Sequence, residues 1–279
     1  MNFEKDMREL TEIPALSGHE DKMIAYLLKR LEGLCEDVHV DKLGNITATY
    51  PGTEEGGVSI AYFAHMDEVG LIVKKVEENG FLRLERVGGV PEKVLPASMV
   101  DVHTLDETKA YRAVIGNTSH HLTPADKKFA VTPIGELYVD LGCKSKAEVL
   151  EKGVDIGSIV TYIPNFTLLG DYVASKALDD RMGIYTLLYM AEELGKTEHK
   201  ATIHLIFTVQ EEFNIRSATP TFCRLQPDAA ICVDISPACD TPELKGRYEM
   251  AVGEGVAIMY MNFHGRGTLG GLLPNPKLN

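Results

Sequence analysis

The acidic pair Glu211-Glu212 follows, after Gln210, the most strand-like stretch of the sequence, residues 201–209. This stretch is mostly apolar and rich in β-branched residues, which indicates a strand buried on both faces of a sheet. Open α/β sheets place their chemistry at the carboxyl ends of such strands. We therefore expect the reaction site at this pair. The simpler alternative is that the strand has already ended and that both carboxylates are solvated.

Two further apolar runs end in groups that could bind a metal ion. His65-Met66-Asp67 follows residues 58–64, and Asp234 follows residues 229–233. At the first of these, the imidazole could be a ligand while the carboxylate of Asp67 holds its other nitrogen. Taken alone, each has a simpler interpretation, with His65 as a structural histidine and Asp234 as a turn former.

The conjunction of these groups indicates metal-dependent hydrolysis. Asp179-Asp180 stands at the start of a predicted helix, where a carboxylate could bridge two cations, although the helix dipole also favours acidic residues there. One histidine and three carboxylate positions offer ligands suited to Zn²⁺, Co²⁺ or Mn²⁺ and resemble a two-metal hydrolase site. Such a site acidifies a water and polarises the scissile carbonyl, and a carboxylate outside the ligand set accepts the proton.

The elements that must position these groups alternate between helices and strands, which indicates an α/β fold. We expect helices over 4–12, 20–34 and about 174–194, a hairpin over 38–50, and a strand over 255–263. The helix at 20–34 is opened by Ser17-Gly18-His19-Glu20, which matches the capping-box pattern.

Residues 69–164 differ in sequence pattern from the segments on either side. Short strands are separated by turns rich in Gly, Pro and Asp, among them the hairpin signal Asn79-Gly80, and one short helix is predicted around 146–152. Closely spaced strands of this kind suggest a small barrel or sandwich. We therefore expect an inserted β-rich domain at 69–164 and a discontinuous α/β domain made of residues 1–68 and 165–279.

Composition and charge argue against several classes of protein. The 279 residues carry a net charge of −13, and binding to nucleic acid phosphates needs Lys and Arg. No apolar run is long enough to span a membrane, and the N-terminus lacks the features of a secretory signal. Five cysteines without a C-x-x-C pair favour a reduced, cytoplasmic setting. The glycine motif at 265–270 lacks a following helix and an acidic partner, so we do not expect dinucleotide binding.

The motifs around these groups resemble those of the glutamyl-aminopeptidase family of two-metal metallopeptidases, which includes tetrahedral-assembly and deblocking aminopeptidases and some members labelled endoglucanases. The resemblance covers essentially the whole chain and rests on residues 65–70 (HMDEVG), 175–181 (SKALDDR), 210–212 (QEE), and Asp234 with 238–242 (ACDTP). It implies a three-layer α/β/α metallopeptidase domain interrupted by a PDZ-like β-barrel that is used in assembly. A homo-oligomer formed through the inserted domain is therefore expected.

The resemblance also implies which residues bind metal. His65 and Asp234 are implied as ligands of one metal, and Glu212 as a ligand of the second. Asp179 is implied as the bridge between the two, commonly with a cis peptide bond to Asp180. The expected cofactors are two divalent metal ions, most often zinc or cobalt and sometimes manganese.

Two residues have catalytic roles by the same resemblance. Glu211 is implied as the general base, and Asp67 as the residue that orients His65. We therefore expect a metal-dependent aminopeptidase that acts on peptide substrates. One alternative is an inactive member of the family that serves as an assembly or binding protein. Another is a glycosidase, or endoglucanase, because paired carboxylates can cleave glycosides without a metal.

The sequence departs from the family pattern in two places. Phe213-Asn214 and Arg216-Ser217-Ala218 stand where the family usually has Gly and Arg-Gly-Ala. Family members also continue past the equivalent of Asn279, and that segment carries a final histidine ligand of the second metal. We therefore expect the first metal site to be complete, the second to bind metal weakly, and some apolar surface to be exposed.

Overall fold

The computed structural model describes residues 1–214, 217–263 and 271–278. The chain divides into two units, residues 1–234 and residues 235–279. All of the predicted site residues belong to the first unit.

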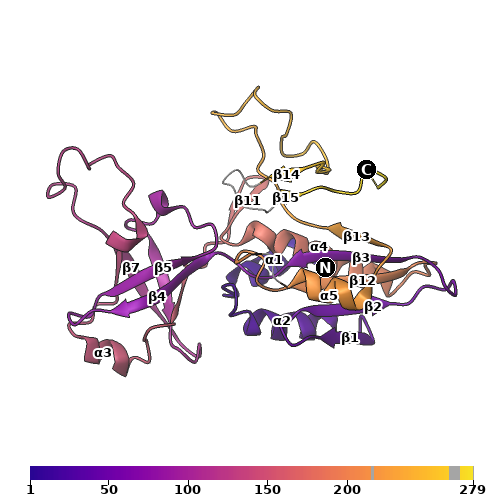
Figure 1. The fold of residues 1–279 in the computed structure, drawn as a ribbon, viewed down its shortest axis with the longest axis horizontal. Coiled ribbons are helices and arrows are strands. Elements are labelled where there is room, and N and C mark those ends of the chain that lie inside the picture. The colour runs from indigo at the N-terminus through magenta and orange to yellow at the C-terminus, as the bar shows by residue number, and fades with distance from the viewer. Residues whose placement is uncertain (215–216, 264–270, 279) are drawn as a thin grey trace. The chain divides into compact units, whose positions relative to one another are not determined.

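A five-stranded mixed sheet forms the centre of the α/β part (Figure 1). Its strands, in spatial order, are β1 (Asp37–Val40), β2 (Ile46–Tyr50), β12 (Thr202–Thr208), β3 (Ser59–His65) and β13 (Ala229–Cys232). The strands β12, β3 and β13 run parallel, whereas β1 and β2 form the predicted hairpin and β2 is antiparallel to β12. Because Thr208 pairs with His65, the carboxyl ends of β12 and β3 lie together.

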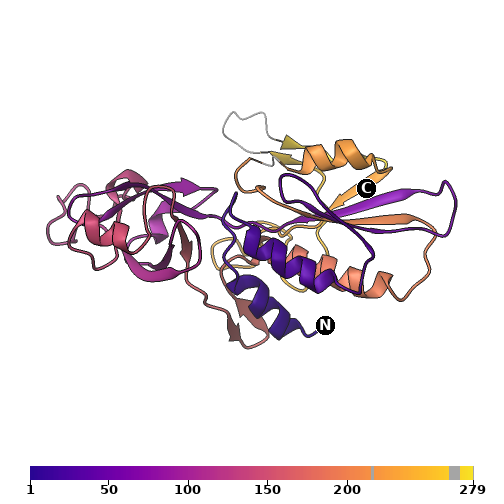
Figure 2. The ribbon, with the colours of Figure 1, turned by 90° about the horizontal axis from the view of Figure 1, so that it is seen from below.

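Helices cover both faces of this sheet. The helices α1 (Phe3–Glu12), α2 (Asp21–Leu31) and α4 (Leu178–Leu194) pack their apolar side chains into one core with the sheet. The helix α5 (Ala218–Leu225) lies on the opposite face (Figure 2). There Phe222 meets Phe63 of β3 edge to face, with 5.0 Å between the ring centroids. The central strand β12 is buried along most of its length, as its apolar sequence predicts.

A closed barrel of six strands lies between β3 and α4 in the sequence, with its own apolar core. The barrel strands are β4 (Gly70–Val76), β5 (Leu82–Val87), β8 (Tyr138–Asp140), β7 (Ala110–Gly116), β6 (Met99–His103) and β9 (Ile159–Tyr162). Short helical segments accompany it: η1 (Glu92–Val94), η2 (Ile134–Glu136) and α3 (Lys146–Glu151). The expected fold class, mixed α/β with a β-barrel, is confirmed, while the proposed domain boundaries at 68/69 and 164/165 stay a prediction.

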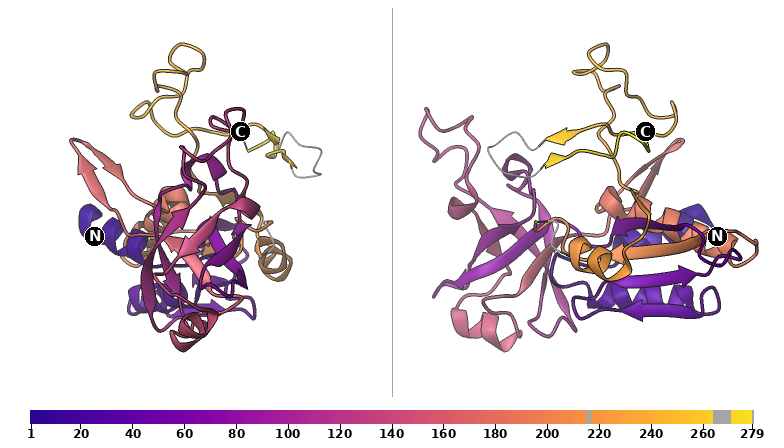
Figure 3. Two further views of the ribbon diagram at one scale, coloured as in Figure 1. Left: turned by 90° about the vertical axis from the view of Figure 1, so that its left-hand side faces the viewer. Right: turned by 45° about the vertical axis from the view of Figure 1, so that its right-hand side comes forward.

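Two local features differ from what the sequence predicts. Residues 255–260 form no strand, whereas β14 (Asn262–Phe263) pairs with β15 (Gly271–Leu272) in the second unit (Figure 3). An exposed hairpin of β10 (Thr167–Leu169) and β11 (Tyr172–Ala174) precedes α4 and was not predicted. The 265–270 glycine motif lies outside the described residues.

The prediction of a capping box is wrong, although α2 does begin after Glu20. The Ser17 hydroxyl donates to Oδ2 of Asp67, and Oε1 of Glu20 accepts from the N–H groups of Gly18 and Gln210. Neither side chain caps α2. No helix in the described part of the chain is long and apolar enough to cross a membrane.

Candidate active site

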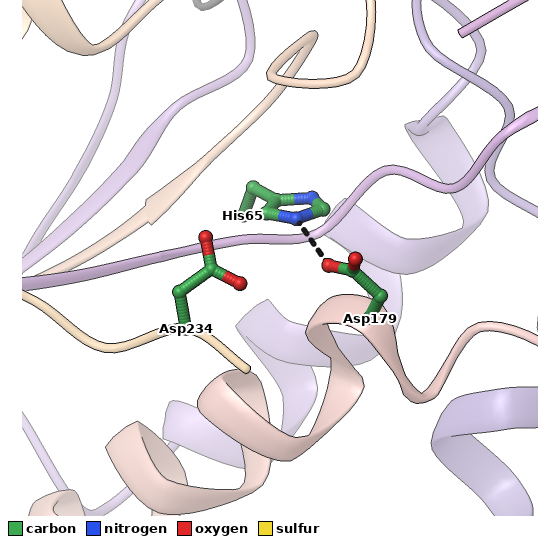
Figure 4. A group of neighbouring side chains, drawn as sticks. All are labelled: His65, Asp179 and Asp234. Atoms are coloured by element: carbon green, nitrogen blue, oxygen red, sulfur yellow. Dashed lines mark hydrogen bonds and ion pairs between the residues drawn. The ribbon is translucent and has the colours of Figure 1, made fainter. Parts of the chain in front are cut away.

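Three of the predicted metal ligands lie together at one edge of the sheet (Figure 4). One donor atom each from His65, Asp179 and Asp234 lie within 4.8 Å of one another. They come from the last residue of β3, the start of α4 and the segment just after β13. The strands β3 and β13 are parallel, so their carboxyl ends meet at this edge. The histidine is buried, whereas the two aspartates are exposed.

Carboxylates face both ring nitrogens of His65. Its Nε2 lies 3.0 Å from Oδ1 of Asp179 and 4.0 Å from Oε2 of Glu211. Its Nδ1 lies 3.2 Å from the backbone oxygen of Asp67 and 3.4 Å from Oδ1 of the same residue. Burial would lower the pKa of His65, but the hydrogen bonds to Asp179 and Asp67 raise it to about 11.

Asp67 connects the histidine to the acidic pair. It is fully buried, and its Oδ1 and Oδ2 accept the backbone N–H groups of Glu211 and Glu212, each at 3.0 Å. The Ser17 hydroxyl also donates to Oδ2. Burial would raise the pKa of Asp67, but His65 and these donors lower it. The carboxylate is therefore ionised at neutral pH and can hold His65 and the backbone of the acidic pair at once.

The side chains of Glu211 and Glu212 are both partly buried at the carboxyl end of β12. Burial raises the pKa of Glu212 to about 7, and the Asp179 carboxylate adds to the effect. Burial also raises the pKa of Glu211, and His65 opposes this. The strand β12 has ended at Thr208, as the simpler alternative assumed, but neither carboxylate is fully solvated. Glu212 nevertheless lies outside the group of three close donors.

Asp179 and Asp180 stand just before the regular part of α4, and both have non-helical backbone angles. The peptide bond between them is cis, as the resemblance implied. Asp180 is fully buried, and its Oδ1 accepts from the N–H of Gly183 at 3.0 Å. Its Oδ2 has no hydrogen-bond partner in the described part of the chain. Burial raises the pKa of Asp180 to about 8, and the Asp234 and Asp179 carboxylates contribute, although His65 opposes them.

This arrangement fits a divalent cation. One imidazole nitrogen and two carboxylate oxygens lie close enough to one another to bind the same cation. Nitrogen and oxygen donors of this kind bind Zn²⁺, Co²⁺ and Mn²⁺. Several carboxylates in the same region have raised pKa values because they are buried near one another. A cation would remove this repulsion and would displace the protons that the carboxylates otherwise hold.

A buried ion pair beside the site was not assigned a role from the sequence. The Lys176 ammonium lies 2.8 Å from both carboxylate oxygens of Glu68, and Oε1 of Glu68 also accepts the N–H of Ala15. Arg181 is fully buried and donates to the backbone oxygen of Leu10. Both cations lie in motifs that the sequence analysis had singled out, and burial of such long charged side chains is the signal that only the fold reveals.

Glu20 and Asn45 were also missed. Oε1 of Glu20 accepts the backbone N–H of Gln210 at 3.0 Å. Oδ1 of Asn45 accepts the backbone N–H of Val209 at 3.1 Å. These partners are separated by more than 160 residues in the sequence. No local periodicity indicates such a pairing, so only the folded chain shows that both residues contact the loop carrying the acidic pair.

Comparisons with known proteins find relatives of this chain. The family model described as M42 glutamyl aminopeptidase matches residues 44–267. The Escherichia coli protein SgcX is 39% identical over 99% of this chain and 74% of its own length. The lysyl aminopeptidase of Pyrococcus furiosus is 32% identical over 89% of this chain and 70% of its own length.

Solved structures of the same kind have a similar fold. An aminopeptidase from the archaeon Desulfurococcus kamchatkensis matches with a TM-score of 0.82 and 32% identity, covering 88% of this chain and 66% of that one. The TET1 peptidase of Pyrococcus horikoshii, which can assemble into a tetrahedron or a large octahedral shell, matches with a TM-score of 0.77 and 30% identity, covering 86% and 72%. The chain thus spans about two thirds to three quarters of the length of these four relatives.

Proposed function

Because the chain belongs to the M42 glutamyl aminopeptidase family, we propose that it is a metal-dependent aminopeptidase that removes N-terminal residues from peptides. The convergence of His65, Asp179 and Asp234 beside the acidic pair is the observation that carries the proposal. These donors come from separate segments of the chain, and an accidental cluster of acids would not include a buried imidazole with both nitrogens facing carboxylates.

The proposal assigns His65, Asp179 and Asp234 to one cation and Asp179 with Glu212 to a second. When bound, divalent cations would supply Lewis-acid polarisation of the scissile carbonyl and acidification of the attacking water. Asp67 keeps His65 in the orientation in which Nε2 faces the ligand group, because Asp67 faces the other ring nitrogen.

Glu211 is the proposed general base. Its carboxylate lies at the ligand group without being one of its three donors, and burial raises its pKa toward the working range of a proton carrier. In the reaction, Glu211 takes a proton from the water as the water oxygen attacks the carbonyl carbon. It then delivers the proton to the amine nitrogen as the C–N bond breaks.

Unequal metal affinity is part of the proposal. Among the described residues, the first group offers three close donors, whereas Asp179 and Glu212 offer two to the second cation. The 279-residue chain should therefore retain about one tightly held metal ion after extensive dialysis, measured by elemental analysis. Two tightly held ions per chain would contradict this assignment.

Release of a chromogenic amine from aminoacyl anilides tests the activity. Glu211→Gln should lower kcat by roughly 10²- to 10⁴-fold, because it removes the proton acceptor and keeps the shape. A chelator should abolish turnover in the unaltered chain. Glu36→Gln makes the same chemical change at an exposed position between α2 and β1 and should leave kcat unchanged.

The alternatives predict different results in the same assay. An assembly or binding protein without catalysis would release no amine from any peptide with a free N-terminus, with or without added metal. A glycosidase would release sugar from glucan substrates and would resist the chelator.

We further propose a cytoplasmic homo-oligomer that assembles through the barrel. Similarity to a peptidase that forms a tetrahedron supports the assembly, and the cysteine pattern supports the location. Light scattering on the purified chain would measure its mass, and a monomer at micromolar concentration would count against assembly.

A further inference from the structure

We propose that the turn Ser17–Glu20 positions the acidic loop, residues 209–212, and that Glu20 is its main positioning residue. The inference rests on the proposed function, since it assumes that Glu211 and Glu212 act in catalysis. It assigns a task to a turn that contributes no side chain to the metal ligands.

Glu20 holds the backbone directly before the general base. Its side chain is buried, with a relative exposure of 4%. Its Oε1 accepts the N–H of Gln210 at 3.0 Å and the N–H of Gly18 at 2.8 Å. Gln210 has a φ of +56°, in the left-handed region that residues other than glycine rarely adopt. A residue in that region persists where its surroundings hold it there, and the Glu20 carboxylate is such a contact.

The same turn reaches the next two amides through Asp67. The Ser17 hydroxyl donates to Oδ2 of Asp67, and the two oxygens of Asp67 accept the N–H groups of Glu211 and Glu212. On the other side of Gln210, Oδ1 of Asn45 accepts the N–H of Val209 at 3.1 Å.

Side chains from distant segments thus bind four consecutive backbone amides, those of residues 209–212. Most backbone amides in proteins bond to other backbone groups. This loop instead depends on three acceptor side chains, Asn45, Glu20 and Asp67, for its conformation.

The Glu20 carboxylate has no comparable task in its own helix. Glu20 precedes α2, and its side chain makes no capping hydrogen bond to that helix. Burying a carboxylate is unfavourable unless donors or opposite charge compensate. Here two backbone donors and the positive charge of the fully buried Arg181 offset part of this cost. The buried acceptor is therefore retained for the loop it contacts.

Steady-state kinetics of Glu20 variants test this role. Glu20→Ala should lower kcat by roughly 100-fold with less than about a threefold change in KM, because a shift of about 1 Å in the base costs that much. Glu20→Gln keeps an oxygen acceptor at the same place and should retain most of the wild-type kcat. Asp21→Asn removes the neighbouring carboxylate, which is exposed at the start of α2, and should match the wild type.

Hydrogen exchange of the amides of residues 210–212 provides a readout that does not depend on turnover. Glu20→Ala should speed their exchange about tenfold while the amides of β12 keep their protection. If the wild-type chain hydrolyses no peptide, the proposed function fails, and exchange alone still decides whether Glu20 holds the loop.

Several results would overturn the inference. One is an unchanged rate of amide exchange in Glu20→Ala. Another is a loss of kcat in Glu20→Gln as large as the loss in Glu20→Ala. A third is an equal loss of kcat in Asp21→Asn. Should Glu20→Ala fail to fold, Glu20→Asp keeps the charge but shortens the side chain by one methylene. Glu20→Asp should then show the lower kcat and the faster exchange of the amides of residues 210–212, while the amides of β12 keep their protection.

Discussion

The carboxylates of the site differ in protonation because their donors differ. Asp67 and Asp180 are both fully buried. Asp67 accepts two backbone N–H groups and a hydroxyl and faces His65, and its pKa is lowered. Asp180 accepts one N–H, and its pKa is raised by burial to about 8. Because both side chains are equally buried, the difference in pKa comes from the hydrogen bonds and charges that stabilise the ionised form. Asp67 is therefore ionised at neutral pH, whereas Asp180 holds a proton.

Glu20 provides a pH-dependent test at the residue scale. Burial raises its pKa from 4.5 to about 7. A carboxylate whose pKa is raised on folding stabilises the fold fully below about pH 4.5, and this stability is lost as the pH rises through about 7. Relative to Glu20→Gln, which has no such proton, the unfolding free energy of the wild type should fall by up to about 3 kcal/mol over this range. Urea unfolding of both chains in chelator measures the two unfolding free energies, and a wild type that gains stability relative to Glu20→Gln as the pH rises would contradict the assignment.

At the scale of elements, local patterns predicted most of the architecture. Continuous apolar runs located β3 and β12, apolar spacing located α4, and each of these elements has a site residue at or near its end. The capping box failed because Ser17 and Glu20 bond to residues 50 and 190 positions away instead of to the first turn of α2. The strand expected at 255–263 failed because alternation alone does not supply a partner strand, and residues 255–260 have none. Sequence reasoning thus succeeds where a local period decides the structure and fails where a distant partner does.

The close packing near the start of α4 leads to a prediction about Gly183, inside that helix, and Gly195, at its C-cap. A Cβ on Gly183 would lie 2.3 Å from Oδ2 of Asp180, so Gly183→Ala must displace a buried carboxylate from its hydrogen bond. We expect a loss of about 1–3 kcal/mol in unfolding free energy, despite the better helix propensity of alanine. Gly195→Ala is the matched control, since its Cβ would find its nearest neighbour at 3.4 Å and its φ is −66°.

Chemical denaturation of both variants separates the steric effect at Asp180 from the general effect of replacing glycine by alanine. Gly195→Ala should be neutral or stabilising by about 0.5–1 kcal/mol, because alanine reduces the entropy of the unfolded chain. A stabilised Gly183→Ala variant would show that the Asp180 carboxylate moves aside freely.

At the scale of the molecule, the candidate site depends on the complete sheet. His65 ends the interior strand β3, which pairs with β12 on one side and with β13 on the other. Asp234 follows β13, an edge strand with mostly exposed side chains. Of the two strands that lead to proposed ligands, β3 to His65 and β13 to Asp234, β13 is therefore the less buried. A cation shared with His65 and Asp179 would connect the end of this strand to the interior of the fold.

Metal binding should consequently stabilise the whole unit of residues 1–234. At a free metal concentration of about 100 times Kd, binding to the folded state alone adds about 2.7 kcal/mol, or roughly 5–10 °C in Tm. Asp234→Asn should abolish most of this rise, because it removes the ligand that connects β13 to the site. Asp171→Asn, an exposed change in the β10–β11 turn, should keep the full rise. Thermal unfolding of the three chains with Zn²⁺ or Co²⁺ and with chelator measures these shifts. An undiminished rise in Asp234→Asn would mean that the stabilising metal binds elsewhere, since the remaining pair, His65 and Asp179, could not hold it as tightly as three ligands do.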